Sequence, residues 1–142
     1  MKRLLAVVMC VLLGLFMVGC GSNDDSEVIG KKTEMTKEET LEYLEQITYR
    51  LVEAEGKEDG SFEQKSSLQA AIGRSESVVE EIEEKYEECP EIIKSTATNT
   101  RLGAEKGLDG QYVYIEIYLE MIIDEIEETI GELPQTLAEF AK

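Results

Sequence analysis

Histidine and tryptophan are absent from this 142-residue chain, and proline occurs only twice. Histidine is the commonest general base in enzymes, and this chain lacks it. Its absence also excludes a Ser-His or Cys-His nucleophile pair and a carboxylate-histidine di-metal site. A glycine-rich phosphate loop and a Gly-x-Ser-x-Gly nucleophile elbow are missing too. The sequence therefore predicts a protein that is not an enzyme and needs no cofactor. A hydrolase that uses carboxylates alone is the enzymatic alternative.

Basic residues are also scarce, with 14 Lys and Arg against 31 Asp and Glu and a net charge of −17. Such a surface repels nucleic acid and anionic lipid headgroups, so we expect no nucleic-acid partner. It attracts cations or a basic protein, although the same charge also serves simply to keep a small domain soluble.

Only one long uncharged apolar run occurs, over residues 4–18, and Lys2 and Arg3 precede it. At 15 residues it is shorter than the roughly 20 that a membrane-crossing helix needs. A cationic start followed by a short apolar segment is the layout of a secretory signal peptide, and a retained membrane anchor is the alternative.

The apolar run ends in Met17, Val18, Gly19 and Cys20. This ending resembles the lipobox of bacterial lipoprotein precursors, with Met17 where leucine is usual. The resemblance implies that the Cys20 thiol takes a diacylglycerol and that the peptide is cut just before it. Two acyl chains hold a protein firmly on a membrane, whereas one holds it only marginally. The expected location is the extracytoplasmic face of a bacterial cell membrane, and ordinary signal cleavage is the alternative.

Three segments follow from this interpretation. Residues 1–19 form the signal peptide, and residues 20–35 form the lipidated cysteine and a flexible tether of Gly, Ser, Asn and charged residues without periodicity. Residues 36–142 form one acidic helical domain. Loss of the signal peptide removes two cations and leaves a net charge of −19.

Cysteine usage excludes an internal disulfide in the mature chain. Cys10 leaves with the signal peptide and Cys20 becomes a thioether, so Cys89 is the only free thiol. We expect Cys89 to be a small buried apolar residue. Intermolecular pairing or reactivity is the alternative.

Two helices are predicted in the first half of the domain. Thr36 and Glu39 form a capping box that opens the first helix, and Gly56 ends it. A second helix is predicted over residues 61–88, where apolar and small residues recur every three or four positions, and Pro90 breaks it. These recurring residues form one seam along the helix, which consists of Leu68, Ile72, Ser75, Val79, Ile82, Tyr86 and Cys89. Gly73 weakens this helix unless a partner helix approaches closely there.

The second half is less regular. Residues 91–107 contain poor helix formers, and we interpret them as a helix whose small residues face the bundle, with an edge strand as the alternative. Residues 111–130 read as a helix that is buried on most of its circumference. Its seam is Tyr112, Ile115, Leu119, Ile122 and Ile126, and its narrow polar stripe is Glu116, Glu120, Asp124 and Glu127.

Residues 111–121 also alternate as a strand does, with Val113, Ile115, Ile117, Leu119 and Met121 on one face. Apolar residues spaced three or four positions apart continue to Ile130. This pattern is longer than typical strands and favours the helix. The predicted fold is therefore all-α, a small antiparallel bundle of three or four helices after a flexible tether. The alternative is an α+β fold with a hairpin of residues 92–102 and 111–121.

Two sets of candidate site residues lie in this last segment. Tyr114, Tyr118 and Met121 flank the seam on a helix and form either core or a docking patch for a partner protein or peptide. Asp109 and Glu116 occupy positions five and twelve of an EF-hand-like phrase whose first and third positions lack suitable ligands. We predict an interhelical turn there and no metal site.

The sequence thus predicts a lipid-anchored extracytoplasmic lipoprotein that acts as a non-enzymatic module for binding a protein or peptide. Its partners are the membrane, through the diacylglycerol on Cys20, and a protein or peptide whose identity the sequence leaves open. The alternative function is binding of divalent cations by surface carboxylates.

Overall fold

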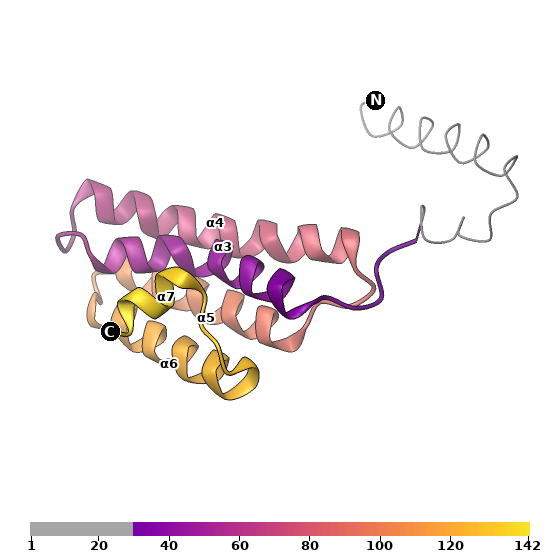
Figure 1. Ribbon diagram of the computed structural model, residues 1–142. Helices are drawn as coiled ribbons and strands as arrows, with labels where there is room; N and C mark the ends of the chain where they lie inside the picture. Colours follow the sequence, from indigo (N-terminus) through magenta and orange to yellow (C-terminus); the bar gives the residue numbers. More distant parts are fainter. Residues whose placement is uncertain (1–29) are drawn as a thin grey trace, which may run out of the picture. The chain divides into compact units, whose positions relative to one another are not determined.

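The computed structural model describes residues 30–142, and residues 34–142 form one compact unit of helices (Figure 1). The predicted signal peptide, Cys20 and most of the predicted tether lie outside the described residues. Within residues 30–142, four long helices and one short helix follow one another in the order α3, α4, α5, α6 and α7.

The first of these helices, α3, spans Lys37–Glu55 and begins at the predicted capping box. The backbone N–H of Glu39 donates to Thr36 Oγ1 at 3.1 Å, and the backbone N–H of Thr36 donates to Glu39 Oε2 at 3.0 Å. Both interactions satisfy N–H groups that have no partner inside the helix. Gly56 caps the other end, as predicted.

Helix α4 spans Phe62–Lys85 and ends three residues before the predicted boundary, because Tyr86 already has extended backbone geometry. The predicted seam is only partly the buried face. Leu68, Ser75 and Ile82 are buried, but Ala71 and Val78 are buried as well. The buried face is wider than a simple seam because α4 packs against both α3 and α5.

Helix α5 spans Glu91–Leu108, so the edge strand considered for this segment is wrong. Its small residues face the bundle as predicted, and the buried ones are Thr96, Ala97, Thr100, Gly103, Ala104 and Gly107. A face of small side chains lets neighbouring backbones come close. Helix α5 accordingly packs against α3, α4 and α6.

Helix α6 spans Val113–Ile130 and ends at Gly131, which has a left-handed φ of 78°. The hairpin alternative is therefore wrong. Four residues of the predicted helical seam are buried, namely Ile115, Leu119, Ile122 and Ile126, with Ile123 beside them, whereas Tyr112 lies just before the helix and is only partly buried. The expectation that α6 is buried on most of its circumference is wrong. It packs mainly on α5 and α3, and a large part of its apolar surface stays exposed.

The short helix α7, Gln135–Phe140, packs on α3. Leu137 is fully buried there, and the backbone N–H and side-chain hydroxyl of Thr136 both donate to the Glu45 carboxylate. No part of residues 30–142 is a strand, which confirms the all-α bundle. Within the same residues, every helix is too short or too polar to cross a membrane.

Candidate functional site

Exposed large apolar side chains concentrate on α6. Within residues 30–142 there are six of them, and four lie on this one helix: Val113, Tyr114, Ile117 and Met121, with exposed fractions of 62%, 38%, 40% and 48%. The other two, Tyr49 and Phe62, lie singly on α3 and α4. Scattered apolar residues are ordinary on a protein surface, but a group of four on one helix is not.

Helical geometry brings these four side chains into one strip. Residues three and four apart lie on the same side of a helix, so Val113, Ile117 and Met121 follow one another along the axis with Tyr114 beside them. The core residues Ile115 and Leu119 occupy the opposite side. We call Val113, Tyr114, Ile117 and Met121 the α6 stripe.

Of the three residues that the sequence singled out, the structure places Tyr114 and Met121 in the α6 stripe. The ammonium of Lys106 lies 5.4 Å from the centre of the Tyr114 ring, in cation-π range. Tyr118 is half-buried and lies against Gly103 of α5, where an added Cβ would be 2.9 Å from the Tyr118 Cβ. Tyr118 therefore holds α6 to α5 and forms only the edge of the stripe.

Helix α6 contributes only negative charge to the surroundings of the α6 stripe, and Lys106 of α5, over the Tyr114 ring, adds one positive charge. Helix α6 carries no lysine or arginine. Its exposed acidic residues are Glu116, Glu120, Asp124, Glu127 and Glu128. At 100° per residue, Glu116 and Glu120 run along one side of the stripe, and Asp124 continues the line of the stripe beyond Met121. The result is a short apolar surface with an acidic border.

The stretch that resembles an EF-hand loop is an interhelical turn. Helix α5 continues through Leu108 and α6 begins at Val113, so only four residues separate them. Gly110 turns the chain with a φ of 84°. Both Asp109 and Glu116 are exposed, and no three acidic or cysteine side chains of residues 30–142 gather closely enough to hold a metal ion.

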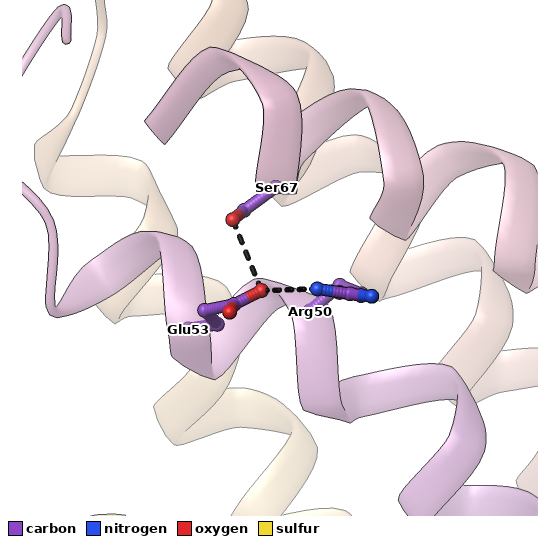
Figure 2. A network of polar contacts seen from close by, with 3 residues as sticks. All are labelled: Arg50, Glu53 and Ser67. Carbon is purple, nitrogen blue, oxygen red and sulfur yellow. Dashed lines mark hydrogen bonds and ion pairs between the residues drawn. The ribbon is translucent and has the colours of Figure 1, made fainter. Parts of the chain in front are cut away.

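A polar network connects α3 to α4 (Figure 2). Arg50 Nη1 lies 2.7 Å from Glu53 Oε2, and the Ser67 hydroxyl donates to the same oxygen at 3.1 Å. The hydrogen bond from Arg50, more than any other contact, holds the pKa of Glu53 below its ordinary value, and Ser67 acts in the same direction. An ionised carboxylate held by its own neighbours stabilises the α3–α4 contact and is not poised for catalysis.

Cys89 is buried, with 6% of its surface exposed, as the sequence predicted. Burial raises the pKa of its thiol, and the nearby Lys94 only partly opposes that effect. A protonated, enclosed thiol is a poor nucleophile. Cys89 thus serves as a small apolar core residue, although it lies in the connection after α4 and not on the helix.

No family model matches this chain, and no match to it was found among the curated proteins or the solved structures. The α6 stripe and its acidic border are therefore interpreted from their own geometry and charge. Of the stripe residues, the sequence did not single out Val113 and Ile117. The excess of apolar residues on α6 over what a single buried seam requires was the available indication of them.

Proposed function

We propose that this protein is an extracytoplasmic lipoprotein, held on a bacterial membrane by a diacylglycerol on Cys20, whose helical domain recruits a basic amphipathic helix of a partner protein. The domain acts as a binding module without catalysis. The observation that carries the proposal is the α6 stripe, an unpartnered apolar helix face with acidic neighbours. The lipid anchor is supported by the resemblance of residues 17–20 to a lipobox.

The chemistry of the partner follows from the stripe and its border. An amphipathic helix that packs on α6 buries its apolar face against Val113, Ile117 and Met121. Basic residues beside that face then lie opposite Glu116 and Glu120, which gives attraction and fixes the partner's orientation.

The acidic border also argues against two other occupants of the α6 stripe. A second copy of this chain would bring Glu116 and Glu120 of the two copies together, and a like-charge juxtaposition is unfavourable. An anionic membrane surface is repelled for the same reason. A separate protein with a basic amphipathic segment satisfies both the apolar and the charged parts of the surface.

Binding is tested with an 18-residue helical peptide of leucine and lysine whose leucines form one face. We expect the Ile117→Ser, Met121→Ser double variant to bind it at least about tenfold more weakly than the wild type. Burial of one large apolar side chain contributes about 1.5–3 kcal/mol, and tenfold corresponds to about 1.4 kcal/mol. Isothermal titration calorimetry on residues 21–142 measures the difference.

Two controls make that titration specific. Phe62 is 81% exposed on α4 and is not part of the α6 stripe, so Phe62→Ser removes an exposed apolar side chain outside the stripe and should leave the affinity unchanged. A scrambled peptide of the same composition has the same charge without the apolar face and should bind weakly. Equal binding of both peptides, or equal losses in the Phe62 and α6 variants, would contradict the proposed docking surface.

The anchor is tested separately through Cys20. We expect wild-type protein to sediment with membranes and the Cys20→Ala variant to lose that association, because the lipid is attached only through the thiol. Mass spectrometry of the wild-type N-terminal peptide should show Cys20 as the first residue with a diacylglycerol added. Membrane association that persists in Cys20→Ala would instead indicate a retained apolar anchor.

A further inference from the structure

A pocket lies at the N-terminal end of α6, beside the α6 stripe. It has a volume of about 240 Å³ and is formed by residues of α3, the α3–α4 connection, α4 and the start of α6. Glu55 comes from the end of α3, Asp59 from the α3–α4 connection, and Val113 and Glu116 from the first turn of α6. Val113 belongs to both the pocket and the α6 stripe, so the two surfaces are continuous.

The pocket has three carboxylates and no basic residue in its lining. Glu55 and Glu116 form no hydrogen bond or ion pair within residues 30–142, and Asp59 accepts only from Gln64 Nε2, at 3.2 Å. Gln64 itself is 1% exposed, and its amide also contacts the backbone of Ala54 and Gly60. The acidic side chains therefore lie beside a buried, hydrogen-bonded Gln64, and no basic side chain in the pocket lining neutralises their charge.

The shape of the pocket favours an organic cation over a metal ion. Its carboxylates do not gather as a metal-binding group, as no such group exists in the described part of the chain. Apolar walls from Val113 and Ile115 fit the methylene stem of a long basic side chain. A planar guanidinium has five donors and spans several separated carboxylate oxygens, which a bare ion or a compact ammonium does not.

We infer that this pocket receives an arginine side chain from the helix that docks on the α6 stripe. This inference rests on the proposed function, because the arginine enters from the end of a partner that already lies along α6. The guanidinium is placed among Glu55, Asp59 and Glu116, with its stem against Val113. The pocket thus sets both the direction of the partner helix and its preference for arginine at one end.

The test compares arginine with citrulline, its neutral counterpart of nearly equal shape. Four versions of the leucine-lysine peptide are made. One pair carries arginine or citrulline in the last turn at one end of the peptide, and the other pair carries them in the last turn at the other end. Both ends are tested because the pocket sets the partner's direction. In one of the two pairs we expect wild-type protein to prefer the arginine peptide by about tenfold or more, as befits charge-assisted hydrogen bonds. Calorimetry gives both affinities under the same salt conditions.

Variants of the carboxylates assign that preference to the pocket. Glu55→Gln, on α3, should reduce the preference several-fold while the citrulline peptide binds as before. Glu116→Gln should also reduce the preference several-fold, but it weakens the citrulline peptide as well, because Glu116 borders the α6 stripe. Glu120→Gln is the matched control, because Glu120 lies one turn further along α6 and does not line the pocket. It should weaken both peptides alike and leave the preference intact.

Each result decides the inference. Equal affinity for arginine and citrulline peptides in both pairs, or a preference that survives Glu55→Gln and Glu116→Gln, overturns the pocket's role. In that case the Ile117→Ser, Met121→Ser variant still shows whether the α6 stripe binds the peptide at all. If wild-type protein binds none of the four peptides, the proposed function fails and the arginine pocket fails with it.

Discussion

Leu119→Ala is expected to lower the free energy of unfolding by about 3 kcal/mol, within the range of about 2–5 kcal/mol for truncation of a buried leucine. Leu119 is fully buried on the core side of α6. The substitution removes its apolar contacts and leaves a cavity that the tightly packed helices α3 and α5 fill only in part. Urea unfolding followed by far-ultraviolet circular dichroism measures the loss.

Met121→Ala is the matched comparison on the same helix. Met121 is 48% exposed in the α6 stripe, so its truncation should change the free energy of unfolding by less than about 0.5 kcal/mol. In a strand, Leu119 and Met121 would share one face and their truncations would cost similar amounts. Similar losses for the two variants would therefore contradict the orientation of α6 on which the docking surface depends.

The boundaries of the helices were predictable because their signals are local. Thr36 and Glu39 start α3 through side chains that bond backbone groups within the same turn, and Gly131 ends α6 with a conformation that glycine adopts without strain. The end of α4 was placed too late. Apolar spacing continues through Tyr86 and Cys89, but Tyr86 has extended backbone geometry, the chain bends before Pro90, and both side chains reach the core from an irregular connection.

The environment of each face was predictable only in part, because it depends on how many neighbours a helix has. The spacing of Ile115 and Leu119 identified the core side of α6, with Ile123 beside it and Ile117 on the far side. What the spacing could not show is that no further helix covers Ile117, which stays exposed. Helix α5 shows the opposite case. Its threonines and glycines are poor helix formers, but their small size lets three helices pack on it, and this tertiary packing outweighs the propensity.

The residues of the candidate site were likewise predictable only in part. Tyr114 and Met121 were expected at a docking surface from their position beside the seam. Tyr118 was grouped with them, but it packs against Gly103, a residue 15 positions earlier in the chain. That contact depends on the crossing of α5 and α6, which no local pattern contains. The arginine pocket could not have been predicted at all, since Glu55 of α3 and Glu116 of α6 are brought together only by the packing of separate elements.

Gly103→Ala is expected to destabilise the domain by up to about 2 kcal/mol. The new Cβ would lie 2.9 Å from the Tyr118 Cβ and 3.4 Å from Leu51 Cδ2. A Cβ atom moves with its backbone, so α5 and α6 must separate to make room, and overpacking of this kind costs about 1–3 kcal/mol. The better helix propensity of alanine offsets about 1 kcal/mol of that cost.

Gly73→Ala is the same substitution in α4, where no atom lies within 4 Å of the added Cβ. No close approach of another helix explains a glycine at this position. The higher helix propensity of alanine is then the only effect of the substitution, so the variant should be more stable by about 0.5–1 kcal/mol. Urea unfolding of both variants compares them directly. Opposite signs are expected because only Gly103 lies at a helix crossing, and a stabilising Gly103→Ala would show that α5 and α6 are not packed closely through Tyr118.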